Sequence, residues 1–151
     1  MNIKFVEGNI LDSKTDVICH QVNCKGFMNS GVAKAIRDKY PKVFESYKEY
    51  CKLSDIFGKI QMCQVSANKY ICNLFGQHDF GYNGSRYTSY DAVYDALTSL
   101  RVYMAINDLQ SVSFPYKMSS VRGGANWDII YCMICQIFKD SKIKIEIWKL
   151  G

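Results

Sequence analysis

The chain has 151 residues, of which 48% are hydrophobic and 22% are charged, a balance that excludes a disordered or fibrous protein. This length favours one domain spanning residues 1–151. The formal net charge of +5 favours an anionic partner, but the basic residues are spread along the chain, so we do not expect a nucleic-acid-binding protein.

The seven cysteines do not predict a disulfide framework, because their number is odd and the sequence shows no signal peptide. We interpret them as reduced, buried thiols. No apolar run approaches the roughly 18–20 residues that span a bilayer. We therefore expect a cytoplasmic protein without a membrane segment. We also expect a monomer.

The first half of the chain alternates strand and helix signals. Residues 1–8 predict a strand, and the apolar run Asp16–His20 predicts a central strand buried on both faces. A polar, glycine-bearing loop then leads to a helix that begins near Val32, and Pro41 separates this helix from a second one with an aromatic face.

The second half continues the pattern. Ile60–Val65 and Tyr70–Phe75 predict a hairpin joined by a short polar turn. The segment Gly76–Ser89 is too long for a tight turn and predicts a functional surface loop. The remaining predicted elements are a helix over Tyr90–Ile106 capped by Thr88 or Ser89, a strand over Val112–Phe114, a helix over Trp127–Phe138 and a strand over Ile143–Trp148.

This order of elements predicts an α/β fold, a three-layer α/β/α sandwich around a central, mixed but mostly parallel sheet of about six strands. Ligands of such sheets bind beyond the carboxyl ends of the strands, where loops lead into helices.

Two loops at those positions have the chemistry of an anion site. Ser30-Gly31-Val32 opens a helix, where free amides and the helix dipole attract phosphate and small residues allow its approach. The segment Pro115–Gly124 repeats this arrangement before the last helix. Each loop alone could be an ordinary connection, but two converging loops would hold a diphosphate from both sides.

Other side chains have competing interpretations. His20 is a candidate general acid or base near neutral pH, but a lone histidine at the end of a buried strand is more often a core residue. His78 and Lys117 are weaker candidates that a surface position explains as well. Cys132 and Cys135 have the spacing of a metal half-site but no second pair, so we interpret them as core packing.

Five segments in this order resemble a macrodomain, the family that binds ADP-ribose, and they cover nearly the whole chain. They are Glu7–Leu11, His20–Cys24 with Gly31–Ala33, Lys39–Lys42, Asn73–Gln77 and Pro115–Trp127. The resemblance is closest to the branch of ADP-ribose 1''-phosphate phosphatases, and more distant to hydrolases that release ADP-ribose from glutamate or DNA.

The resemblance implies roles for individual residues. Asn9 stands where the family has an adenine-contacting aspartate, with Ile10 supplying an amide, and Asn23 matches the asparagine beside the distal ribose. It implies catalytic roles for His20 and Asn23. The implied ligand-binding residues are Asn9, Ile10, Asn23, Ser30, Gly31, Val32, Ser119, Ser120, Val121, Arg122, Gly123 and Gly124. The aromatic residues Phe80, Tyr82 and Tyr87 are candidates for stacking on a base or ribose.

The sequence also departs from the family. Ser119 and Val121 occupy two positions that are glycine in the second phosphate loop, where side chains narrow the cleft or require unusual dihedrals. The segment Gly76–Asp79 lacks the lysine of the glutamate- and DNA-directed hydrolases, and Gly123 and Gly124 replace their acidic partner. A lysine-dependent mechanism is therefore not expected.

The implied function is binding of ADP-ribose and hydrolysis of ADP-ribose 1''-phosphate or another distal-ribose derivative, without a cofactor or metal. The alternative is a reader that binds ADP-ribose or an ADP-ribosylated protein without chemistry.

Overall fold

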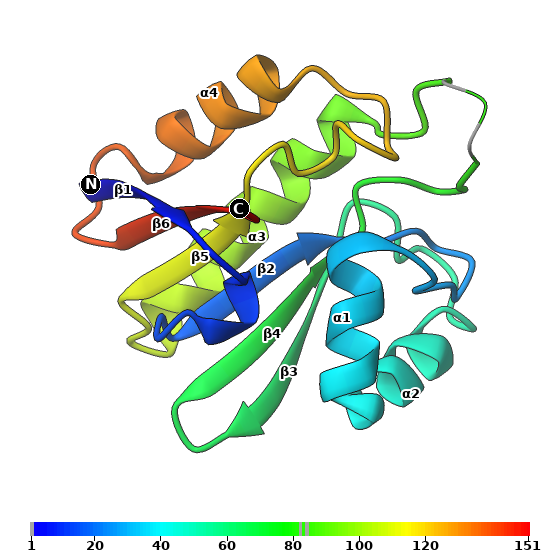
Figure 1. The fold of residues 1–151 in the computed structure, drawn as a ribbon, viewed down its shortest axis with the longest axis horizontal. Coiled ribbons are helices and arrows are strands. Elements are labelled where there is room, and N and C mark those ends of the chain that lie inside the picture. Colours follow the sequence, from blue (N-terminus) through cyan, green and yellow to red (C-terminus); the bar gives the residue numbers. More distant parts are fainter. Residues whose placement is uncertain (1, 82, 84) are drawn as a thin grey trace.

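The computed structural model describes residues 2–81, 83 and 85–151. Six strands form one mixed sheet in the order β1-β6-β5-β2-β4-β3, with helices on both faces (Figure 1). The strands are β1 (Asn2–Glu7), β2 (Val17–Gln21), β3 (Ile60–Ser66), β4 (Lys69–Leu74), β5 (Ser111–Pro115) and β6 (Lys144–Lys149). The helices are a 3₁₀ turn (Ile10–Asp12), α1 (Gly31–Lys39), α2 (Pro41–Tyr50), α3 (Tyr90–Ile106) and α4 (Trp127–Phe138).

Strand β3 pairs antiparallel with β4, whereas the other neighbouring strands pair in parallel. The predicted hairpin and the predicted mixed, mostly parallel sheet of six strands are therefore confirmed. Ser89 caps α3 by accepting a hydrogen bond from the amide of Ala92. It is one of the two residues predicted to cap this helix.

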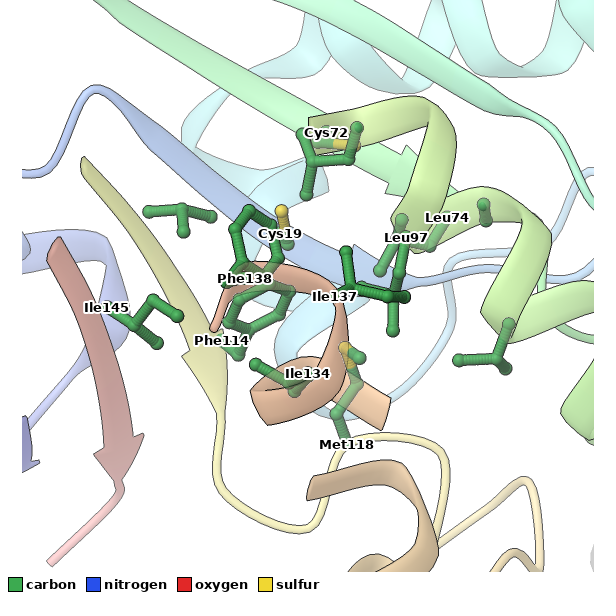
Figure 2. Close-up of a cluster of buried hydrophobic side chains, with 14 of the residues drawn as sticks. Cys19, Cys72, Leu74, Leu97, Phe114, Met118, Ile134, Ile137, Phe138 and Ile145 are labelled. Carbon is green, nitrogen blue, oxygen red and sulfur yellow. The ribbon is translucent and has the colours of Figure 1, made fainter. Parts of the chain in front are cut away.

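Alternate residues of β2 enter different layers, as expected for a strand buried on both faces. Val17 and Cys19 belong to the large cluster that α3 and α4 cover, part of which Figure 2 shows. Ile18 packs on the other face in a cluster that includes Ile36 of α1 and Val43 of α2. The two helical layers therefore lie on opposite faces of the sheet.

The cysteines are all free thiols, but the prediction that they are buried holds only for Cys19 and Cys72. The interpretation of Cys132 as core packing is wrong, because α4 turns this residue to solvent, and Cys135 is half-buried. An apolar helical run buries one face only, and Cys132 lies off that face.

None of the helices in the described residues has the length and apolar character needed to cross a bilayer.

Candidate functional site

A cleft of about 350 Å³ opens between β2 and β5 at the carboxyl ends of the parallel strands. The two strands pair through Val17 with Val112 and Ile18 with Ser113, and they separate beyond those pairs. The helix that follows β2 lies on one face of the sheet and the helix that follows β5 lies on the other (Figure 1). Such a switch point is where open α/β sheets bind ligands, and the volume suits a small molecule.

Three loops surround the cleft. They are the β2–α1 loop (residues 22–30), the β4–α3 loop (75–89) and the β5–α4 loop (116–126). The described lining residues are His20–Asn23, Phe27, Asn29–Ala33, Gln77, Phe80, Gly81, Pro115–Ser119 and Val121–Gly123. The two loops expected to converge do so.

The N-terminus of α1 faces this cleft without a side-chain cap. Ser30 is the N-cap residue but its hydroxyl makes no capping hydrogen bond, whereas Asn126 caps α4 by accepting from the amide of Asp128. Gly31 has φ +59°, which a residue with a side chain rarely adopts, and a Cβ there would stand in open space. The first amides of α1 are thus accessible to an anion.

The β5–α4 loop is a series of tight turns. The amide of Met118 donates to the carbonyl of Pro115, and the amide of Ser120 to that of Lys117, both at 3.0 Å. Lys117 and Ser119 have φ +59° and +70°, a conformation that costs a non-glycine residue about 1–2 kcal/mol. Two of the four described non-glycine residues with positive φ thus line the cleft, and such strain is common in binding loops.

Gln21, at the end of β2, ties the other two loops together. Its Nε2 donates to Oε1 of Gln77 at 2.7 Å and to Oγ1 of Thr88 at 2.8 Å. Its Oε1 accepts from Oγ of Ser119 at 2.6 Å. Both amide protons and the carbonyl oxygen of Gln21 are therefore used to fix loop positions.

The same two loops also meet through backbone atoms. The amides of Tyr87 and Thr88 donate to the carbonyl of Gly123 at 2.8 and 2.9 Å. A Cβ on Gly123 would collide with Oγ1 of Thr88 and would lie 2.6 Å from the carbonyl oxygen of Ser119. Glycine at 123 is required for this approach.

The structure explains how serine occupies a position expected to be glycine. Ser119 is buried, and its hydroxyl is bound to Gln21 beneath the cleft. Val121 lines the cleft but is 77% exposed, so its side chain stands on the rim.

Asn23 lines the cleft, but its side-chain amide mainly holds its own loop. Its Nδ2 donates to the carbonyl of Phe27 at 3.0 Å, and its Oδ1 accepts from the amide of Lys25 at 2.9 Å. The hydroxyl of Tyr47 lies 2.8 Å from the same Oδ1. One amide proton of Asn23 remains for a ligand.

His20 lies at the floor of the cleft and is 2% exposed. Its Nε2 lies 2.6 Å from Oδ1 of Asn73, whose Nδ2 donates to Gln61. This orientation of Asn73 assigns the proton to Nε2, and Nδ1 makes no hydrogen bond with any described residue. Burial lowers the pKa of His20 to about 4, although the bond to Asn73 acts in the opposite direction. At neutral pH the imidazole is uncharged, which does not suit a general acid, and the lowered pKa makes it a weak general base.

Several candidates lie outside the lining of the cleft. Asn9 caps the 3₁₀ turn by accepting from the amide of Leu11 at 3.0 Å, and Ile10 is buried in the cluster under α1. Ser120 and Gly124 belong to the β5–α4 loop but do not contribute to the described lining. Tyr87 is bound to Asn83, and Tyr82 lies outside the described residues.

The charge of the cleft suits an anion. Lys117 and Arg122 line it, and no described lining residue carries a carboxylate. Among the described residues there is also no group of three or more His, Cys, Asp or Glu placed to hold a metal ion.

Comparison with known proteins gives curated relatives that include a DNA ADP-ribosyl glycohydrolase and an ADP-ribose 1''-phosphate phosphatase. No protein-family model matches the chain. Over 143 residues, 91% of this chain, it is 27% identical to the DNA ADP-ribosyl glycohydrolase of Mycobacterium tuberculosis, and it spans only 39% of that protein's length. Over 48 residues, 31% of this chain, it is 35% identical to the ADP-ribose 1''-phosphate phosphatase of Aspergillus fumigatus, 24% of which is covered.

Solved structures establish the fold. The macrodomain of Mycobacterium tuberculosis DarG matches with a TM-score of 0.84 at 22% identity, covering 97% of this chain and 96% of that one. This chain has the macrodomain fold. Thermosipho africanus DarTG in complex with ADP-ribose matches with a TM-score of 0.84 at 18% identity, covering 99% of this chain and 42% of that one.

The residues predicted from the sequence did not include part of this cleft. Gln21 and Phe27 line it but were not among the predicted residues. For Gln21 a signal existed, because a polar residue ending an apolar strand at the ligand edge of a sheet requires a partner.

Proposed function

We propose that the cleft binds ADP-ribose, with the diphosphate held between the N-terminus of α1 and the β5–α4 loop. The observation that carries this proposal is the convergence of Gly31 and Ser119 on one cleft. Both positions have left-handed φ values. Gly31 opens a helix whose first amides attract an anion, and Ser119 lies in a loop of tight turns, a kind of backbone that can form an anion-binding concavity.

The charges support the same ligand. Lys117 and Arg122 line the cleft, and the described lining residues include no carboxylate. A diphosphate carries about two negative charges at neutral pH and gains from both the cations and the amides. The similarity to structures of macrodomains, one solved with ADP-ribose, is consistent with this choice.

The distal ribose is assigned to the region of Asn23, which retains one unused amide proton. The assignment of Asn9 and Ile10 to the adenine rests on the family resemblance alone, because neither lines the cleft.

Calorimetric titration with ADP-ribose and with AMP tests the proposal. We expect ADP-ribose to bind at least about tenfold more tightly, because AMP lacks the second phosphate and the distal ribose that the two loops would hold. Absence of ADP-ribose binding, or equal affinity for AMP, would refute it.

Hydrolysis of ADP-ribose 1''-phosphate is the second candidate function, and the relative in Aspergillus fumigatus supports it. In this cleft the chain's contribution would be the amides of α1 and of the β5–α4 loop, which stabilise negative charge in the transition state. The neutral, buried His20 favours the alternative, a reader of ADP-ribose or of ADP-ribosylated protein.

Release of inorganic phosphate from ADP-ribose 1''-phosphate separates these two functions. Turnover that disappears in a Gly31→Ala variant would establish an enzyme. Tight binding of ADP-ribose without any phosphate release would establish a reader for this ligand.

A further inference from the structure

Two aromatic side chains from different loops meet at the cleft. Phe27 of the β2–α1 loop and Phe80 of the β4–α3 loop have ring centroids 5.0 Å apart with an interplanar angle of 50°. Both line the cleft. They are 53 positions apart in the sequence, so this contact exists only because the two loops converge.

Core packing does not explain the pair. Phe27 is 47% exposed and Phe80 is 36% exposed, and neither belongs to the buried clusters found among the described residues. Large aromatic side chains left exposed at a cleft are more often involved in ligand contacts than in stability.

The loops that carry the two rings are joined directly behind them. The amide of Cys24 donates to the carbonyl of His78 at 3.1 Å, and Sγ of Cys24 lies 3.5 Å from the carbonyl oxygen of Gln77. The bases of both loops are thus fixed, and the partly exposed rings meet across the space between the loops. A ring contact of this kind is weak enough for a ligand to separate.

The Phe27–Phe80 pair lies close to Asn23, and this position indicates which part of a ligand it would contact. Asn23 bonds both backbone groups of Phe27, accepting from its amide and donating to its carbonyl. In the proposed function, on which this inference rests, the distal ribose lies beside Asn23. The Phe27–Phe80 pair then lies next to the distal ribose, the part of ADP-ribose through which it is attached to a macromolecule.

We propose that the Phe27–Phe80 pair is a specificity determinant that closes the distal end of the cleft. Free ADP-ribose fits behind the closed pair, with the apolar rings excluding water from the distal ribose. ADP-ribose attached to a macromolecule requires the rings to separate, and the lost ring contact lowers its affinity. The cleft therefore prefers small, free ADP-ribose derivatives to ADP-ribosylated macromolecules.

The test compares two ligands by calorimetry, free ADP-ribose and a short peptide carrying one ADP-ribose on a serine. In the wild-type protein we expect free ADP-ribose to bind up to about tenfold more tightly, the factor that an aromatic contact supplies. Phe27→Ala and Phe80→Ala should each bring this ratio close to one by improving peptide binding. The double variant should resemble either single variant, because both changes remove the same contact.

Phe5→Ala is the matched control. Phe5 is 61% exposed and contacts Tyr131 with centroids 5.9 Å apart, but neither ring lines the cleft, so this variant should keep the wild-type ratio. Equal binding of both ligands by the wild type, or an unchanged ratio in Phe80→Ala, would overturn the inference alone. Failure of the wild type to bind either ligand would refute the proposed function and this inference with it.

Discussion

The hydroxyl of Ser119 donates a 2.6 Å hydrogen bond to Oε1 of Gln21, a residue 98 positions earlier in the chain. Ser119 has φ +70° and is buried. Gln21, which also lines the cleft, fixes the position of its hydroxyl. The bond connects β2, which leads to the first proposed phosphate site at the N-terminus of α1, to the β5–α4 loop, which forms the second.

We predict that Gln21→Met weakens ADP-ribose binding at least about tenfold, because the three part-buried hydrogen bonds that hold two loops to the end of β2 are lost. Thermal unfolding should show a loss of about 1–3 kcal/mol. Gln64→Met is the matched control, because Gln64 is exposed on β3. If calorimetry finds the affinity of Gln21→Met unchanged, the loops do not depend on Gln21.

Ser119→Gly should affect stability in a way that depends on Gln21. The substitution relieves the cost of the left-handed φ but removes the bond to Gln21, so in the wild type these effects largely cancel. In the Gln21→Met background only the relief remains, and Ser119→Gly should recover about 1 kcal/mol of stability. Additive effects in this double-mutant cycle, measured by urea unfolding, would contradict the coupling.

Gly31→Ala tests the first phosphate site against a matched glycine. Gly31 and Gly58 have φ +59° and +81°, and neither would place a Cβ closer than 3.6 Å to a neighbouring atom. Both alanine variants should lose about 1–2 kcal/mol of stability through backbone strain. Only Gly31→Ala should also weaken the binding of ADP-ribose, because Gly58 does not line the cleft. Similar affinities of the two variants for ADP-ribose would argue against a phosphate bound at the N-terminus of α1.

Acidification should destabilise the protein through His20. Burial lowers the pKa of this residue from 6.5 to about 4, so the unfolded chain takes up the proton first. Above pH 6.5 the effect is absent, and by pH 4 it removes about 3 kcal/mol of stability.

The variant His20→Gln should lose less stability than the wild type when urea unfolding is compared at pH 7 and pH 4.5. His78→Gln, which removes an exposed histidine, should leave the wild-type loss in place. An equal loss in His20→Gln and in the wild type would show that His20 is not the group responsible.

The sequence was sufficient to predict the six strands and four α-helices described, but not the 3₁₀ turn at Ile10–Asp12. The helix α3 over Tyr90–Ile106 and the helix α4 over Trp127–Phe138 have the predicted bounds. Their signals are local, because a capping serine or asparagine and an apolar stripe determine where a helix begins and which face it buries. The convergence of the two loops also followed from topology, since parallel strands end at one edge of the sheet.

The side-chain partners within the cleft could not be predicted in the same way. The bond between Gln21 and Ser119 and the contact between Phe27 and Phe80 join residues more than 50 positions apart. The periodicity of apolar residues along the sequence does not indicate such long-range pairs. The environment of His20 was equally hidden, because the neighbour that binds its ring, Asn73, lies on another strand.

Backbone amide NMR during titration with ADP-ribose tests the central claim most directly. We predict the largest shift changes at the amides of Gly31 and Val32 and of residues 119–123, the two segments proposed to hold the diphosphate. Shift changes confined to other parts of the chain, or none at saturating ADP-ribose, would contradict the account.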